Sequence, residues 1–298
     1  MLKNDLSKRF KMKDIGILSW FLGIQFNFRD NSISMSQSNF ICKVLDKFDM
    51  KDSNPKSIPC DINVNKFNCE ESKLLENPTL YREIVGSLIY IMSCTRPDLS
   101  YIVTKLSQYM NKPTKAHLNY AKDVLRYLKR TVNYDLVFRK SAHSFHLFGY
   151  CDSDWGGSED RRSISGYCYK LCPDSALISW KSKKQTVFSL SSCEAEYTAL
   201  TYAIQEGKFL RQLFSDMENR NVENFDLFVD NQGALKLANN PVHQQRSKHI
   251  DIKYHFIRND VQNGIVRLIY VPTNSNIADM FTKCVSKIKL DKFNFRGT

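Results

Sequence analysis

In the first 140 residues, the apolar positions predict one hairpin followed by helices. Residues 20–37 form two arms rich in aromatic and alternating residues, and Arg29 to Asn31 make the turn between them. Apolar residues at helical spacing predict one helix over 39–50 and three more between 81 and 131. Pro97 and Pro113 precede the last two. The polar residues 51–77 predict a loop.

From about His146 the pattern changes to short apolar runs that predict strands over 145–152, 165–172, 176–180 and 186–191. A helix then begins near Ser191, followed by a strand over 225–230, a helix from 231, a helix within 248–262 and a strand over 266–271. This order predicts an α/β fold with a mixed sheet flanked by helices. Residues 132–140 are expected to form an edge strand or a linker, and the basic residues 289–298 a frayed tail.

Length and charge narrow the choice of function. A chain of 298 residues has room for about two domains. The net charge of +12 is uneven, because residues 1–140 contain 23 Lys and Arg against 14 Asp and Glu. A basic half favours a polyanionic partner such as nucleic acid, although a basic surface with no such partner has the same composition.

Nine cysteines without paired spacing, and no secretory signal, favour reduced thiols. No apolar run approaches the roughly 20 residues of a membrane span. We therefore expect a cytoplasmic or nuclear protein that is neither secreted nor held in a membrane.

Four carboxylates stand at positions where chain segments end or begin. Asp152 and Asp230 end apolar runs, Glu194 lies at a helix start, and Asp279 follows the last strand and a turn. Acids in these settings can converge at one edge of a mixed sheet, where they repel one another unless cations lie between them. Mg²⁺ prefers oxygen ligands, and two such ions could hold both oxygens of a phosphodiester displacement.

Each acid also has an ordinary structural explanation. Ser191 and Glu194 have the spacing of a capping box, in which the Glu bonds back to the helix start. Asp230 and Asp279 could each cap a short helix. Glu196 is the second candidate on the same helix, should Glu194 serve only as a cap.

The motifs that contain these acids resemble the ribonuclease H domain of copia-type retrotransposon Pol polyproteins. They occur in the family's order as GYCDSDWGG with DRRSISGYCY (149–169), ISWKSKKQ (178–185), SLSSCEAEYTAL (189–200), VDNQGAL (229–235), SKHIDIKYHFIR (247–258) and VPTNSNIADMFTK (271–283). The resemblance implies a ribonuclease H-like fold and hydrolysis of the RNA strand of RNA–DNA hybrids. It also implies Asp152, Glu194, Asp230 and Asp279 as catalytic ligands of two Mg²⁺ ions, with Mn²⁺ as a substitute. Asn276 stands where the family usually has Gln, and Cys193 where Thr is common.

The upstream half is similar to the end of the family's reverse transcriptase. Residues 9–26 resemble the segment after the polymerase active site, and residues 81–131 resemble the helices that join polymerase to ribonuclease H. The resemblance divides the chain into a remnant of palm, thumb and connection (1–140), a ribonuclease H-like domain (141–285) and a basic tail (286–298). The polymerase motif Tyr-x-Asp-Asp is absent, so polymerase activity is not expected.

Two basic helix faces are candidates for contact with the hybrid. One lies on the helix before residue 131, and the other on the helix within 248–262; their candidate residues are Lys122, Arg126, Lys129, Arg130, Lys248, Lys253 and Arg258. A solvated helix face is the alternative for each of them. Other parts of the Pol polyprotein are possible partners, and virus-like particles a possible location.

Three other functions fit parts of the sequence. An integrase core shares the fold class, but its acids run Asp, Asp, Glu, whereas Glu194 comes second here. A domesticated or decaying fragment would bind nucleic acid without cleaving it. A residual polymerase subunit would lack the polymerase carboxylates.

Overall fold

The computed structural model describes residues 2–61, 72–140, 146–158, 160–219, 221–239, 248–293 and 295–297. For Leu2, Asn239 and residues 248–252 only the backbone is described. After α1 (Leu2–Arg9), the chain forms the predicted hairpin from β2 (Ile24–Arg29) and β3 (Ser32–Ser36), with β1 (Trp20–Phe21) on one side. The strand β4 (Leu136–Arg139) pairs with β3, so residues 132–140 contain the edge strand of this small sheet.

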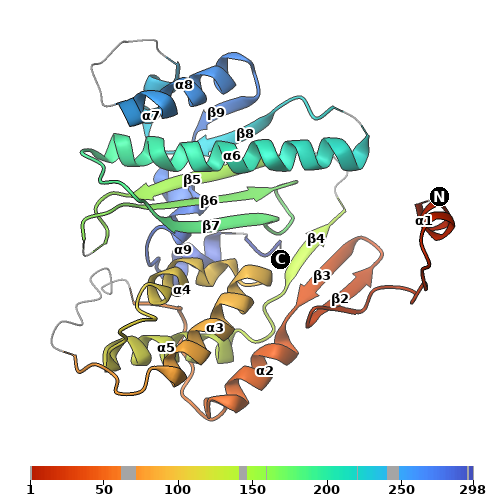
Figure 1. Cartoon of the computed structure of the whole chain (residues 1–298), viewed down its shortest axis with the longest axis vertical. Coiled ribbons are helices and arrows are strands. Elements are labelled where there is room, and N and C mark those ends of the chain that lie inside the picture. Colours follow the sequence, from red (N-terminus) through yellow and green to blue (C-terminus); the bar gives the residue numbers. More distant parts are fainter. Residues whose placement is uncertain are drawn as a thin grey trace.

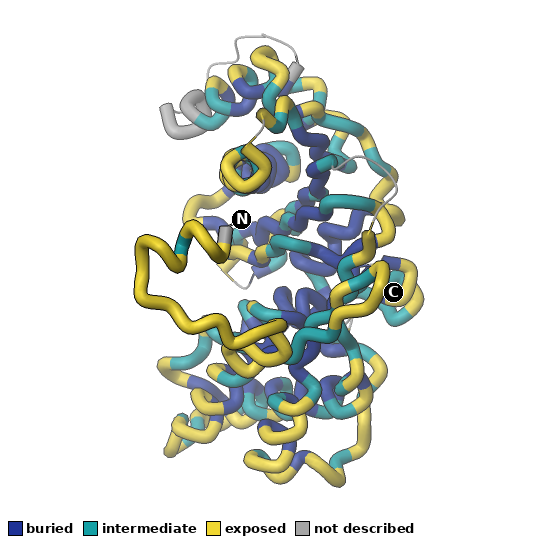
Figure 2. The backbone as a smooth tube through the Cα atoms, turned by 90° about the vertical axis from the view of Figure 1, so that its right-hand side faces the viewer, coloured by how far each residue is buried: buried dark blue, intermediate teal, exposed yellow. Residues whose placement is uncertain are grey.

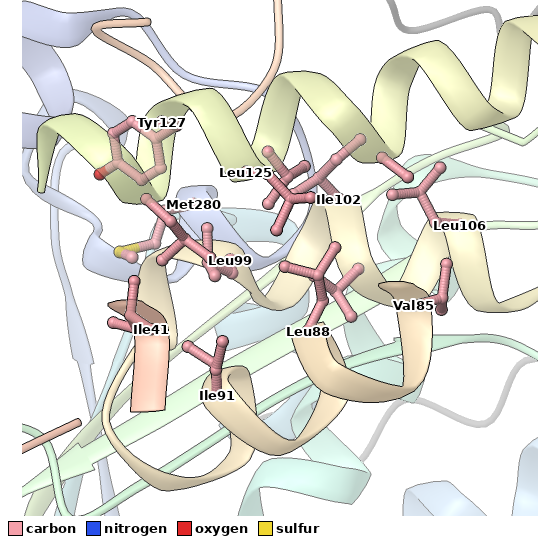
Figure 3. Close-up of a cluster of buried hydrophobic side chains, with 14 of the residues drawn as sticks. Ile41, Val85, Leu88, Ile91, Leu99, Ile102, Leu106, Leu125, Tyr127 and Met280 are labelled. Atoms are coloured by element: carbon pink, nitrogen blue, oxygen red, sulfur yellow. The ribbon is translucent and has the colours of Figure 1, made fainter. Parts of the chain in front are cut away.

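The predicted helices are present as α2 (Ser38–Lys47), α3 (Thr79–Cys94), α4 (Ser100–Ser107) and α5 (Lys115–Arg130). The short helix η2 (Pro97–Leu99) leads into α4. Their apolar stripes meet in one core, because residues such as Leu88, Ile102 and Leu125 are fully buried (Figure 3).

An ion pair is enclosed beside this core. The Arg96 guanidinium donates to both carboxylate oxygens of Asp98 at 3.0 and 2.7 Å, and to Thr131, while Tyr127 donates to Asp98. Both charged side chains are almost fully buried, and the hydrogen bonds compensate their loss of water.

The second sheet has the order β7-β6-β5-β8-β9. β5 (Phe148–Asp154), β6 (Ile164–Lys170) and β7 (Ser179–Lys184) are antiparallel, while β8 (Phe225–Val229) and β9 (Val266–Tyr270) run parallel to β5. This mixed sheet flanked by helices is the arrangement that the resemblance to ribonuclease H implies, and it confirms the predicted α/β fold class. The strand predicted over 186–191 is wrong: these residues form a loop in which Phe188 and Leu190 are exposed.

The sheet separates two layers (Figure 1). The long helix α6 (Ser192–Glu218) covers one face, with α7 (Gln232–Asn239) and α8 (Lys248–Gln262) beside it. On the other side lie the helices of the first half and α9 (Lys287–Lys292). The short helices η3 (Thr273–Ser275) and η4 (Ile277–Phe281) follow β9, and η4 contacts β5, β6 and α4. Figure 2 shows buried residues in both parts of the molecule, and the exposed segment that precedes the hairpin.

The C-terminal segment contradicts the expectation of a frayed tail. Leu290, Phe293 and Phe295 are buried in the same apolar cluster as the helices α3, α4 and α5. Backbone bonds also connect Val137 to Arg296 and Leu177 to Phe295. The free energy gained by removing these apolar side chains from water exceeds the preference of the basic side chains for an exposed tail, so the segment packs against the core.

A disulfide joins Cys60 to Cys284, with their Cα atoms 6.0 Å apart. The expectation of reduced thiols is therefore wrong for this pair. The two cysteines are 224 residues apart, so their spacing in the sequence does not indicate that they pair. Six other cysteines of the described residues lie outside this pair. Among the described helices, none is both long enough and apolar enough to cross a membrane.

Candidate metal centre

Three aspartates meet at one edge of the second sheet. Asp152 lies on β5, Asp230 directly follows β8, and Asp279 lies in η4. One carboxylate oxygen from each lies within 4.8 Å of the other two. Asp152 and Asp279 are buried, whereas Asp230 is half-buried. This group fits a divalent cation, which accepts several carboxylate oxygens at once.

Sheet pairing and one glycine explain why the three acids converge. The parallel pairing of β5 with β8 brings Asp152 and Asp230 to the same edge. Gly166 pairs with Asp152 on the neighbouring strand β6. A Cβ atom at Gly166 would lie 2.7 Å from Phe281 Cβ and 3.0 Å from the Ala278 carbonyl oxygen. The absence of a side chain at this position therefore allows η4, which carries Asp279, to pack directly on the strand.

Hydrogen bonds hold η4 against β5. The buried Asn276 amide donates to the Cys151 carbonyl at 2.9 Å, and its oxygen accepts from the Ala278 N–H at 3.1 Å. The Thr282 hydroxyl donates to an Asp152 carboxylate oxygen. The side-chain amide of Asn276 therefore anchors the turn before Asp279.

The prediction for Glu194 does not agree with the geometry. Its carboxylate accepts from the Leu190 N–H at 2.7 Å, and its own N–H donates to the Ser191 hydroxyl at 3.2 Å. Glu194 thus satisfies free N–H groups at the start of α6, which is the capping alternative. The structure brings Glu196 to the aspartates instead, because α6 turns this residue inward, where it is 6% exposed.

The electrostatics of Glu196 agree with this placement. Burial, together with the charges of Asp152 and Asp230, raises the pKa of Glu196 well above its ordinary value. Burial and the charge of Asp152 likewise raise the pKa of Asp230. Glu196 Oε2 is buried and has no hydrogen-bond partner. A buried carboxylate oxygen without a donor is free to bind a cation, so this oxygen and the three aspartates fit a metal.

Two lysines that the sequence analysis did not single out lie at the centre. Lys283 Nζ is 2.8 Å from Asp279 Oδ1 and 4.0 Å from Asp152 Oδ2. Lys289, from α9, donates to Asp279 Oδ2. Lys283 follows Asp279 by four residues, a spacing that could have identified it. Lys289 depends on the packing of α9, which no local pattern indicated.

The candidate nucleic-acid ligands have more intramolecular contacts than the sequence suggests. On α5, Arg126 pairs with Asp123 at 3.1 Å, Lys129 donates to the Ser53 carbonyl at 2.7 Å, Lys122 is half-buried, and Arg130 is exposed.

The second set of candidates lies on α8. Lys253 donates to the Thr198 hydroxyl at 3.1 Å, and the Arg258 guanidinium lies 5.9 Å from the ring centre of Tyr254. The side chain of Lys248 lies outside the described residues.

Comparison with known proteins gives consistent matches. A family model described as "Reverse transcriptase (RNA-dependent DNA polymerase)" matches residues 1–62. The chain is 38% identical over 97% of its length to the retrovirus-related Pol polyprotein from transposon RE1 of Arabidopsis thaliana, of which it covers 20%. It is 36% identical over 97% of its length to the corresponding polyprotein from transposon TNT 1-94 of Nicotiana tabacum, of which it covers 22%.

Among solved structures, half of the chain matches ribonuclease H1 from Halobacterium salinarum. The sequence identity is 16%, the TM-score is 0.35, and 99% of that protein is covered.

Proposed function

The chain belongs to the family of retrovirus-related Pol polyproteins of copia-type transposons and spans about one fifth of the length of the curated relatives it matches; from this premise, we propose that it is a metal-dependent ribonuclease H. Its substrate in this proposal is an RNA–DNA hybrid, of which it hydrolyses the RNA strand. The observation that carries the proposal is the meeting of Asp152, Asp230 and Asp279 within 4.8 Å at a sheet edge that also holds Glu196.

The order of the acids along the chain favours this nuclease over an integrase core. With Glu196 in place of Glu194 the glutamate still comes second, whereas an integrase core has it last. The absence of the polymerase motif leaves the ribonuclease H half as the part with a complete acid set.

Asp152, Glu196, Asp230 and Asp279 would hold Mg²⁺, or Mn²⁺ in its place. Bound divalent cations supply the acidity that activates a water molecule, and they stabilise the charge of a leaving oxygen. Asn276 and Thr282 keep Asp279 and Asp152 in place through the bonds described above. The half-buried Asp230 provides the side of the group that is open to solvent.

Binding of the hybrid would use the basic helix faces, with the exposed Arg130 as the best-placed member of the first face. Each phosphate contact releases about one counterion, so binding should weaken with added salt. Distinguishing RNA from DNA would require contacts with the 2′-hydroxyl groups. We further propose that residues 1–140 and 141–285 correspond to the reverse transcriptase remnant and the nuclease, that other Pol segments are partners, and that the protein works in the cytoplasm or nucleus.

The test uses the purified chain and a hybrid whose RNA strand is labelled at its 5′ end. We expect RNA cleavage with Mg²⁺ and none with EDTA, and no cleavage of the DNA strand or of a DNA duplex. Asp152→Asn and Asp230→Asn should each reduce cleavage by at least about 100-fold, because each removes a charged ligand. Asp174→Asn, at an exposed acid after β6, is the matched control. Cleavage by both site variants at the rate of the control would refute the site.

A further inference from the structure

The acidic group contains two ammonium groups of the chain itself. Lys289 donates to one oxygen of Asp279, and Lys283 lies 2.8 Å from the other. Both oxygens of the buried Asp279 therefore face a lysine rather than a solvent molecule. Lys283 is also 4.0 Å from Asp152, and its charge acts on Asp230 and Glu196 as well.

The two lysines arrive from different directions. Lys283 follows η4 directly, whereas Lys289 belongs to α9, whose position is fixed by the burial of Leu290 and Phe293. The Lys289 side chain is 21% exposed, and that of Lys283 is 33% exposed, so both ammonium groups can move from the carboxylates to solvent. In this arrangement the two ammonium groups pair with the carboxylates only while no divalent cation occupies the same oxygens.

The charges explain why lysines lie here. Four carboxylates without counterions would repel one another strongly in a buried setting. Two ammonium groups compensate half of that charge and occupy the oxygens that a divalent cation would bind. A divalent cation gives a larger Coulomb energy at the same oxygens, so it can displace an ammonium group.

We propose that Lys289 is a built-in competitor of the divalent metal: it holds Asp279 in the metal-free protein and must leave that carboxylate before the metal centre is complete. This inference rests on the proposed function, because it assumes that the acidic group binds metal. Competition by Lys289 makes the metal affinity of the acidic group lower than the affinity that the four carboxylates alone would give.

The experiment compares Lys289→Met with Lys287→Met. Both residues lie on α9 and both changes remove one positive charge, but Lys287 pairs with Asp291 and not with the acidic group. The binding of Mn²⁺ alone is measured by calorimetry on the full chain at fixed salt. We expect Lys289→Met to bind the first Mn²⁺ ion at least about tenfold more tightly than the wild type, and Lys287→Met to stay within about twofold.

A second measurement guards against a variant that merely folds poorly. Lys289→Met leaves the buried Asp279 with Lys283 as its remaining ammonium partner, so the variant should melt at a lower temperature than the wild type in EDTA. Saturating Mn²⁺ should raise its melting temperature by more than it raises that of the wild type.

The outcomes separate the two hypotheses. If the wild type binds Mn²⁺ but Lys289→Met and Lys287→Met change its affinity equally, the competition by Lys289 is refuted and the metal centre stands. If Lys289→Met binds more weakly than the wild type, the lysine supports the metal and the inference is also refuted. If neither the wild type nor Lys289→Met binds Mn²⁺, the proposed function itself fails.

Discussion

Replacement of Glu196 by Gln separates the role of this residue from that of Glu194. The Glu196 side chain is 6% exposed, it accepts one hydrogen bond from the Ser153 backbone, and its other oxygen has no partner. Gln has almost the same shape and can still accept from Ser153, but it carries no charge. The change therefore removes a metal ligand and, in the same step, a buried charge that destabilises the metal-free protein.

The expected gain in stability follows from the charge, because the raised pKa means that folding disfavours the ionised form of Glu196 that the unfolded chain adopts at pH 7. A buried group of this kind costs about 1–3 kcal/mol, so Glu196→Gln should raise the free energy of unfolding in EDTA by about that amount at pH 7. For a chain of this size the melting temperature should rise by roughly 2–8 °C. RNA cleavage with Mg²⁺ should fall by at least about 100-fold.

The gain should also depend on pH. The folded-state pKa of Glu196 is raised above its ordinary value of 4.5, so the folded protein holds this proton more tightly than the unfolded chain. Stability is therefore lost as pH rises from the unfolded pKa through the folded pKa. Below the unfolded pKa, Glu196 is protonated and neutral in both the folded and the unfolded state. The difference in stability between the wild type and Glu196→Gln should then disappear.

Glu194→Gln is the control, because its carbonyl oxygen can still accept from the Leu190 N–H at the start of α6. We expect its cleavage rate and its melting temperature to stay close to those of the wild type. Thermal unfolding is followed by circular dichroism in EDTA at pH 7 and pH 4, and cleavage is followed on the labelled hybrid. If Glu194→Gln loses activity while Glu196→Gln keeps it, the assignment of Glu196 is wrong. An unchanged melting temperature of Glu196→Gln at pH 7 would refute the argument from burial.

Four further predictions concern the support of the site and the fold. Gly166→Ala should lower cleavage at least about tenfold and destabilise the protein by about 1–3 kcal/mol, because a methyl group would push η4 away; chemical denaturation and the cleavage assay measure both. Asp98→Ala should cost about 3–5 kcal/mol in urea unfolding, since it leaves a buried guanidinium without its anion. Hydrogen bonds from Arg267 and His146 outweigh burial and lower the pKa of Asp226, so its contribution to stability is present above the unfolded pKa and lost as pH falls through the folded one. In urea titrations, Asp226→Asn should therefore be less stable than the wild type at pH 6 and almost equal to it at pH 2. Cys60→Ser should cost about 2–4 kcal/mol, and in the absence of a reductant it should expose the Cys284 thiol to a thiol reagent; equal thiol counts in wild type and variant would contradict the disulfide.

Much of the fold could be predicted from the sequence because its signals are local. Apolar stripes predicted the helices α2 to α5, and the order of strands and helices predicted the mixed sheet. A strand was wrongly predicted over 186–191 because this run is rich in strand-forming residues. In the structure it is a loop that passes over the surface between β7 and α6. Strand propensity measures a fit to a half-buried surface, and that surface is absent there.

The choice between Glu194 and Glu196 shows where local reasoning ends. Both residues follow Ser191 within one and a half helical turns, and two steps along a helix change direction by about 200°. Only the packing of α6 on the sheet decides which of them faces Asp152. Lys289 and the Cys60–Cys284 pair likewise depend on contacts between segments far apart in the chain.

The position of Met280 has a consequence for how this polypeptide can be divided. Its side chain lies among Ile41, Leu99 and Tyr127 of the first half, while its neighbour Asp279 completes the acidic group (Figure 3). In the division proposed above, residues 1–140 and 141–285 share one apolar core, so a fragment that begins at residue 141 would lose the packing that holds Asp279 in position. The proposed boundary along the sequence is therefore not a boundary between two separate cores.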